Sequence, residues 1–231
     1  MYLDATTHRS VINLLNMKIF LDTADYEAIS ERYETGLVDG ITTNPTLVRK
    51  SGVNYLDFIK TLASDFAFES ISAEVDGDTD VEMIRNAQQY IEVGENVTIK
   101  LPLTKDGLSA CKVLTDDGIE TNVTLCFSAA QAVMAAKAGA TYISPFVGRM
   151  NDNSLSGVEL VRAIAGLYGT HGVRTKILAA SLRDVHHVSR CFLYGASVCT
   201  LPPAVFDKMY THVLTDAGLA IFEKDFKEIN G

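Results

Sequence analysis

The stretch NVTIKLPLTKDGLSACKVLTDDG, residues 96–118, combines the two patterns that predict the fold. Its first part, NVTIKL, is rich in β-branched and aliphatic side chains, which indicates a buried strand. Its last part, DGLSACKVLTDDG, spaces apolar residues three or four apart and ends in glycine, which indicates an amphipathic helix with a left-handed C-cap. The stretch therefore predicts one strand followed by one helix.

The same alternation of strand and helix recurs along the chain from Met17 onward, which is typical of a parallel sheet built from βα units. Eight strands are predicted, at residues 18–23, 38–43, 70–75, 96–101, 121–126, 141–146, 176–181 and 197–202. The helices that follow them are predicted at residues 26–36, 56–66, 80–94, 106–118, 128–139, 157–172, 183–195 and 203–214.

Eight such units without a linker predict an α/β fold, a single (β/α)8 TIM barrel. An open doubly wound sheet is the alternative, but neither glycine motif of a nucleotide site, G-x-G-x-x-G or G-x-x-x-x-G-K-[ST], is present. We assign residues 17–231 to the barrel, with an extra C-terminal helix at 217–229. Residues 1–16 are expected to be an N-terminal extension, in part disordered, and either Met1 or Met17 is the physiological start.

The composition excludes several classes of protein. A net charge of -9 over 231 residues argues against a nucleic-acid partner, because phosphate backbones require clustered Lys and Arg. The chain lacks an apolar run of the roughly 18 residues that a membrane span requires, and residues 1–16 lack the features of a signal peptide. The four cysteines form no C-x-x-C pair and lie mostly in apolar runs, so we expect a cytoplasmic protein with reduced thiols.

Lys100 lies near the end of the fourth predicted strand. Side chains alternate along a strand, so Lys100 shares a face with Thr98 while Ile99 faces the other way. If the aliphatic face packs on helices, the ammonium points into the barrel, where it must be paired or lose its proton. A neutral amine is a nucleophile that forms a Schiff base with a carbonyl substrate. The alternative is a structural lysine whose ammonium reaches solvent.

Other side chains that could bind a substrate or take part in catalysis lie at the C-terminal ends of the predicted strands, where TIM barrels carry their active sites. Each has a structural explanation of its own: Asp22 could cap a helix, Ser181 and Arg183 could begin one, and Phe146 could be a core aromatic. A shared active site explains all of them together. The candidates are Asp22, Asn44, Glu74, Lys100, Asn122, Thr124, Ser144, Phe146, Arg149, Ser181 and Arg183.

At these residues the sequence resembles the transaldolase family, in the short single-domain branch that also contains the fructose-6-phosphate aldolases. The combination of TTNP, a strand lysine and SPFVGR carries most of the resemblance. The matching stretches are FLDTAD (20–25), GITTNPTL (40–47), VTIKLPLTKDGL (97–108), GIETNVTLCFSAAQA (118–132), GATYISPFVGRM (139–150) and ILAASLRD (177–184).

The resemblance implies a class I mechanism that needs no metal and no organic cofactor. It implies that Lys100 forms a Schiff base with the C2 carbonyl of a ketose phosphate and that Asp22 handles the proton of the hydroxyl at which the carbon chain breaks. Glu74 and Thr124 would hold a catalytic water. The substrate hydroxyls would be bound by Asn44 and Asn122 with Ser144 beside them, and the phosphate by Arg149, Ser181 and Arg183.

Two positions separate the branches of the family. Aldolase members tend to carry Gln at the position of Glu74 and Tyr at that of Phe146, so this chain has the transaldolase residue at both. The resemblance therefore predicts transfer of a dihydroxyacetone unit between sedoheptulose 7-phosphate and glyceraldehyde 3-phosphate, in the pentose phosphate pathway. The alternatives are a fructose-6-phosphate aldolase, which is a lyase, and a non-catalytic barrel that binds sugar phosphates.

The resemblance also implies a homo-oligomer, a pentamer or decamer in which the last helix packs on a neighbour. The apolar residues Leu219, Phe222 and Phe226 of that helix fit such packing, and they would equally suit packing on the chain's own barrel.

Overall fold

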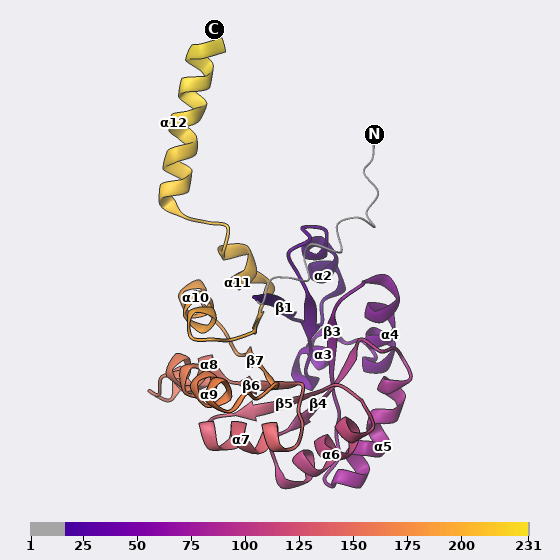
Figure 1. The fold of residues 1–231 in the computed structure, drawn as a ribbon. Helices are drawn as coiled ribbons and strands as arrows, with labels where there is room; N and C mark the ends of the chain where they lie inside the picture. The colour runs from indigo at the N-terminus through magenta and orange to yellow at the C-terminus, as the bar shows by residue number, and fades with distance from the viewer. Residues whose placement is uncertain (1–16, 231) are drawn as a thin grey trace.

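The strands of the computed structural model pair in chain order and the eighth pairs with the first, so they form a closed parallel barrel (Figure 1). The structure describes residues 17–230, so the expected extension at 1–16 lies outside the described residues. The prediction of a (β/α)8 barrel is confirmed. Its strands are β1 (Lys18–Asp22), β2 (Gly40–Thr42), β3 (Ser70–Glu74), β4 (Val97–Pro102), β5 (Thr121–Cys126), β6 (Tyr142–Pro145), β7 (Lys176–Ala179) and β8 (Val198–Leu201).

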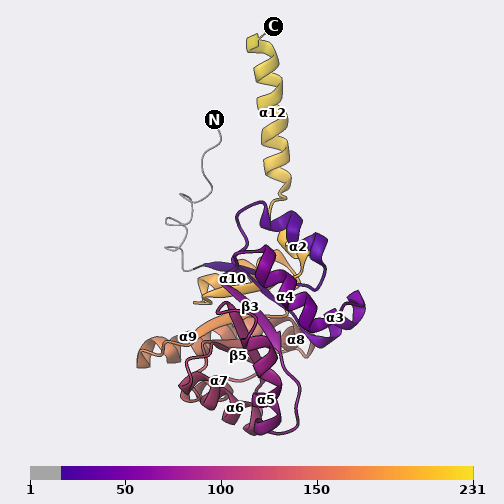
Figure 2. The same ribbon diagram turned by 90° about the vertical axis from the view of Figure 1, so that its right-hand side faces the viewer.

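Except for the last one, α12 (Val213–Asn230), the helices lie around this barrel (Figure 2). Those that the sequence predicted are α2 (Tyr26–Tyr33), α4 (Tyr55–Asp65), α5 (Asp80–Ile91), α6 (Lys105–Asp116), α7 (Ala129–Lys137), α9 (Gly157–His171), α10 (Val185–Leu193), α11 (Pro203–Lys208) and α12 (Val213–Asn230). Two further helices, α3 (Pro45–Ser51) and α8 (Val147–Asp152), were missed because each is too short to show a periodic pattern.

The prediction of one helix over residues 203–214 is wrong. Helix α11 ends at Lys208. The backbone hydrogen bonds that follow join residues three apart rather than four, as from the Tyr210 amide to Asp207 O. A new helix, α12, begins at Val213, directly after His212, whose ring Nδ1 accepts a hydrogen bond from the Leu214 amide at 3.1 Å. The final helix is consequently longer than the predicted 217–229.

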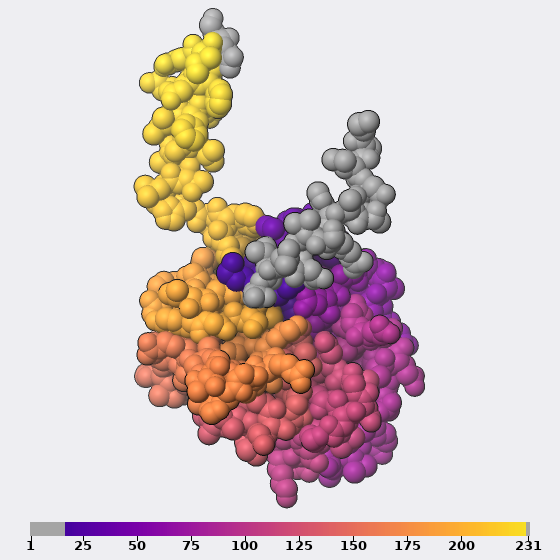
Figure 3. Space-filling view, in the orientation of Figure 1, coloured from indigo at the N-terminus to yellow at the C-terminus, as the bar shows by residue number. Residues whose placement is uncertain are grey.

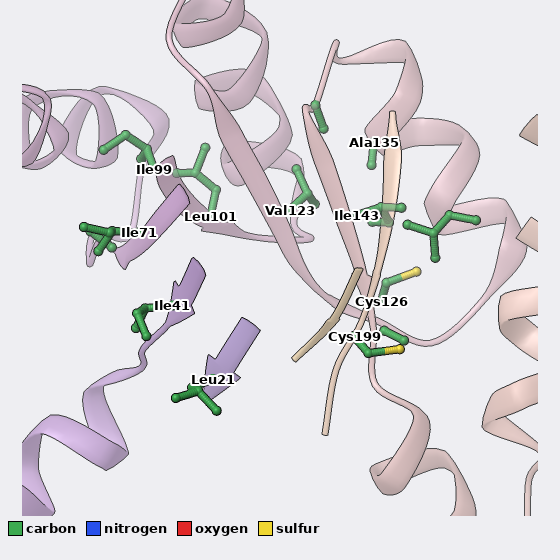
Figure 4. Close-up of a cluster of buried hydrophobic side chains, with 14 of the residues drawn as sticks. Leu21, Ile41, Ile71, Ile99, Leu101, Val123, Cys126, Ala135, Ile143 and Cys199 are labelled. Atoms are coloured by element: carbon green, nitrogen blue, oxygen red, sulfur yellow. The ribbon is translucent and has the colours of Figure 1, made fainter. Parts of the chain in front are cut away.

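The strand side chains fall into two apolar clusters. The outer one lies between strands and helices and includes Ile99 and Leu101; Figure 4 shows it with Leu21, Ile41, Ile71, Val123 and Ile143. The inner one fills the barrel with Phe20, Tyr142, Leu178, Ala180 and Val198. Because Ile99 and Leu101 belong to the outer cluster, alternation turns Lys100 inward, as expected.

Strand β5 contains a bulge beside the barrel mouth. Its register with β6 shifts between Val123 and Cys126, and Leu125 has a left-handed backbone with φ of 63°. The extra residue reverses the alternation of side chains. As a result Thr124 stays on the cavity side, while Cys126 turns into the outer core.

Helix α12 projects away from the barrel in all three overall views (Figures 1, 2 and 3). Leu219 and Phe222 on it are 60% and 61% exposed. The packing of this helix on its own barrel is therefore not seen. Among residues 17–230, no helix has both the length and the apolar character that crossing a membrane requires.

Candidate active site

A cavity of about 140 Å³ opens at the C-terminal ends of the strands. It is lined by nine of the eleven residues that the sequence singled out, namely Asp22, Asn44, Lys100, Asn122, Thr124, Ser144, Phe146, Arg149 and Ser181. Glu74 and Arg183 lie beside it, since Glu74 contacts Lys100 and Arg183 approaches Gly148, the residue before Arg149. The topology thus gathers seven strand ends into one site.

The Lys100 side chain is held inside the barrel with only 6% of its residue surface exposed. Its Nζ lies 2.8 Å from Glu74 Oε2 and donates a hydrogen bond to the carbonyl of Thr43 at 3.0 Å. The alternative of an ammonium that reaches solvent is therefore wrong. An amine fixed between a carboxylate and a carbonyl has a proton acceptor within reach and one face toward the cavity.

Asp22 lies opposite, at the end of β1, and accepts a hydrogen bond from Thr42 Oγ1 at 2.9 Å. Burial raises the pKa of this carboxyl above its ordinary value, although the charge of Lys100 and the bond from Thr42 oppose the rise. The capping explanation does not apply, because Asp25 caps α2 by accepting the Ala28 amide at 3.1 Å. Because burial favours the protonated form of this carboxyl, Asp22 is a candidate to exchange a proton with a substrate.

The amide of Asn122 is fixed by two hydroxyls. Its Nδ2 donates to Ser72 Oγ at 3.2 Å, and its Oδ1 accepts from Ser144 Oγ at 2.7 Å. Asn44 is held differently, since its Oδ1 accepts the Leu47 amide at 3.0 Å and so caps α3. Both amides are consequently rigid donors and acceptors at the cavity wall.

Thr124 has an unsatisfied hydroxyl. Among the described residues, its buried Oγ1 has no hydrogen-bond partner. Buried polar atoms are nearly always bonded, and those that are not call for an unseen water or ligand. Because Thr124 lines the cavity, its hydroxyl is available to a water or to a substrate hydroxyl there.

The basic residues gather where α8 packs against the end of β7. The guanidinium of Arg149 lies over the Phe146 ring, 5.0 Å from its centre. A Cβ on Gly148 would lie 2.0 Å from Ser181 O, so only glycine permits this approach. Arg183 donates to Asp152 Oδ1 at 2.5 Å. The helix-start explanation for Ser181 and Arg183 does not apply in its simple form, because Asp184 caps α10.

The sequence reasoning missed several residues of the site. Thr42 and Thr200 line the cavity and share a hydrogen bond of 2.6 Å, and Tyr55 contacts Thr43 from outside the barrel. Thr42 is the last residue of β2, two positions before Asn44, so its place at a strand end could have indicated it. Among residues 17–230, no three His, Cys, Asp or Glu side chains are grouped so that they could hold a metal ion.

Comparison with known proteins shows to which family the chain belongs. The family model for transaldolase/fructose-6-phosphate aldolase matches residues 19–230. The chain is 50% identical to a probable transaldolase of Caulobacter vibrioides over 91% of this chain and 96% of the relative. It is also 50% identical to probable transaldolases of Ruegeria sp. strain TM1040 and of Dinoroseobacter shibae, over 97% of each relative. The chain belongs to the transaldolase/fructose-6-phosphate aldolase family.

Proposed function

We propose that this enzyme is a transaldolase that moves a dihydroxyacetone unit from a ketose phosphate to an aldose phosphate through a Schiff base on Lys100. The observation that carries the proposal is the position of the Lys100 amine, buried in a cavity and 2.8 Å from the Glu74 carboxylate. A non-catalytic binding protein has no need of a buried amine with a carboxylate partner. The buried, unpaired cysteines support a reducing compartment, and we place the reaction in the cytoplasm, in the pentose phosphate pathway.

The first half of the reaction forms the Schiff base. Lys100 passes a proton to the Glu74 carboxylate that it contacts, its amine adds to C2 of sedoheptulose 7-phosphate, and the resulting carbinolamine loses its hydroxyl as water to give an iminium. Glu74 accepts and returns the protons through a water that the Thr124 hydroxyl also holds. The unsatisfied Oγ1 of Thr124 and the contact of Glu74 with Lys100 support these roles.

The second half breaks and remakes a carbon–carbon bond. Asp22 takes the proton of the C4 hydroxyl, the C3–C4 bond breaks, and its electrons move to the iminium to form an enamine, so erythrose 4-phosphate leaves as an aldehyde. The enamine then attacks the aldehyde carbon of glyceraldehyde 3-phosphate, whose oxygen takes the proton back from Asp22. Hydrolysis releases fructose 6-phosphate. The raised pKa of Asp22 suits a group that must accept and return one proton.

The remaining side chains would bind the substrate. Asn44 and Asn122 offer fixed amides to the hydroxyls of the three-carbon unit, and Ser144 orients Asn122. Arg149, Ser181 and Arg183 would bind the phosphate, because guanidinium groups match phosphate oxygens in charge and geometry. A local pair of arginines can do this in a chain whose net charge is -9.

The distinguishing experiment measures glyceraldehyde 3-phosphate released from fructose 6-phosphate, with and without erythrose 4-phosphate. The proposal requires that release depend on this acceptor, because the enamine must be consumed by an aldehyde before the next turnover. Equal release without the acceptor would make the enzyme a fructose-6-phosphate aldolase, the other activity in the family name.

The change Phe146→Tyr tests the same distinction within the site. Phe146 lines the cavity, and a hydroxyl there could hold a water that protonates the enamine. We expect acceptor-independent release of glyceraldehyde 3-phosphate to rise several-fold, measured with a coupled dehydrogenase. Phe127→Tyr is the control, because the Phe127 ring lies 5.8 Å from that of Phe146 but is not part of the cavity lining. An unchanged rate for Phe146→Tyr would reject this role of Phe146.

We further propose that the chain forms a homo-oligomer, a pentamer or decamer, through α12. The exposed Leu219 and Phe222 on a projecting helix support the proposal, because large apolar side chains at such a surface favour association. Light scattering should give a mass of five or ten chains, and Leu219→Ser with Phe222→Ser should reduce it. Val81→Ser, at a residue of α5 that is 70% exposed, should not. A single-chain mass for the unaltered protein would contradict the proposal.

A further inference from the structure

Tyr55, the first residue of α4, reaches from the helix layer toward the barrel mouth. Its hydroxyl accepts a hydrogen bond from the backbone amide of Glu74 at 2.7 Å and lies 2.6 Å from Thr43 Oγ1. It is not part of the cavity lining. Burial raises the pKa of this phenol, so it stays neutral and keeps a proton to donate.

The direction of each hydrogen bond around Tyr55 follows from the donors available. Thr43 Oγ1 donates its only proton to the carbonyl of Ser72 at 3.0 Å, because a carbonyl can only accept. Tyr55 must therefore donate its own proton to Thr43 Oγ1, while its oxygen accepts the Glu74 amide. The chain runs in one direction, from the Glu74 amide through Tyr55 and Thr43 to Ser72, and every member is satisfied.

The two residues that Tyr55 holds are the two whose oxygens bind the Lys100 amine. Glu74 supplies a carboxylate oxygen at 2.8 Å from Nζ, and Thr43 supplies its carbonyl at 3.0 Å. We propose that Tyr55 is a positioning residue that fixes the Lys100 amine by anchoring both of its partners. This inference rests on the proposed function, because it concerns the rate at which Lys100 attacks a carbonyl.

The consequence of removing the hydroxyl follows from the same contacts. In Tyr55→Phe the Glu74 amide loses its acceptor and Thr43 loses its donor, so both partners of Lys100 gain freedom. Misplacement of a reacting group by about 1 Å can cost about a hundredfold in rate. We therefore expect Schiff-base formation to slow by about tenfold to a hundredfold. KM should change little, because Tyr55 does not line the cavity.

The experiment measures how fast borohydride traps the adduct of fructose 6-phosphate on Lys100, together with kcat, KM and the pH profile. Tyr90→Phe is the matched control, because its ring packs 5.5 Å from that of Tyr55 but makes no contact with Glu74 or Thr43 among the described hydrogen bonds. Thr43→Val should slow trapping as Tyr55→Phe does, because it removes the hydroxyl that Tyr55 contacts. Thr43→Ser keeps a hydroxyl and should trap the adduct at the rate of the unaltered enzyme.

The outcomes separate this inference from the proposed function. If the unaltered enzyme forms no adduct on Lys100, the proposed function fails and the inference fails with it. If the unaltered enzyme forms the adduct and both Tyr55→Phe and Thr43→Val form it equally fast, only the positioning role is rejected, even where the melting temperature falls. Should Tyr55→Phe not fold, Thr43→Val against Thr43→Ser decides the question on its own.

Discussion

In Lys100→Met, turnover of fructose 6-phosphate in the presence of erythrose 4-phosphate should fall by roughly 10⁴-fold or more, the scale seen when a covalent nucleophile is removed. Methionine matches the length of lysine and suits a buried site, but it has no amine to form the Schiff base. Borohydride treatment with substrate should leave the variant without an adduct, as measured by the mass of the intact chain.

A lysine elsewhere on the barrel provides the control. Lys176 begins β7 and pairs with Glu69 at 3.4 Å, away from the cavity. Lys176→Met should keep normal turnover and a normal adduct. In Lys100→Met, Glu74 loses its cation but remains 24% exposed, so we expect the variant to fold, which circular dichroism would check. Activity and an adduct in Lys100→Met would reject the Schiff-base mechanism.

Asp22→Asn should separate the two halves of the reaction. An amide cannot accept the C4 hydroxyl proton, so turnover should fall by about 10²- to 10⁴-fold, the usual contribution of a general acid or base. Adduct formation on Lys100 should persist, because it precedes the step that Asp22 serves. Quenched-flow trapping beside steady-state turnover would show this, and equal losses in both would contradict the assignment.

The same variant predicts a pH-dependent gain in stability. Burial holds the pKa of Asp22 above its ordinary value of 3.8, so the native state favours the protonated form more than the unfolded state does. The unaltered protein therefore loses stability as pH rises from about 4 through the raised pKa. The melting temperature of Asp22→Asn should exceed that of the unaltered protein at pH 8, and the gap should close toward pH 4. Asp25→Asn is the control, because it keeps a good N-cap for α2. It should turn over at the normal rate and show no such pH-dependent difference in melting temperature from the unaltered protein.

The fold could be predicted because each βα unit carries a complete local signal. In β4 the alternation of Thr98, Ile99 and Lys100 fixes which face meets the helices, and the structure agrees. Helix α8 has no such signal, since six residues cannot show an apolar stripe. At the break before α12 the ring of His212 accepts the Leu214 amide, a contact that the spacing of apolar residues does not reveal.

The site was predictable to the extent that its residues lie at strand ends. Closure of a parallel barrel brings all such ends to one rim, so Asp22 and Lys100 could be placed together from the sequence. Tyr55 could not, because it begins an amphipathic helix and its contacts with Glu74 and Thr43 arise only from tertiary packing. The pairing of Arg183 with Asp152 depends in the same way on how α8 meets β7.

Two serines of this molecule share an unusual backbone, with φ of 60° at Ser154 and 58° at Ser181. A residue other than glycine in this left-handed conformation costs about 1–2 kcal/mol of stability, and glycine removes that cost. The greater freedom of glycine in the unfolded chain takes back about 0.5–1 kcal/mol of the gain. By this reasoning alone, a substitution by glycine at either serine would raise the stability of the protein to heat. Ser154 is exposed in the turn after α8 and is open to it, whereas Ser181 lines the cavity, where glycine would remove a hydroxyl. A designer who reads the backbone alone would gain heat resistance at Ser154 without touching the cavity, but at Ser181 would remove a hydroxyl from its wall.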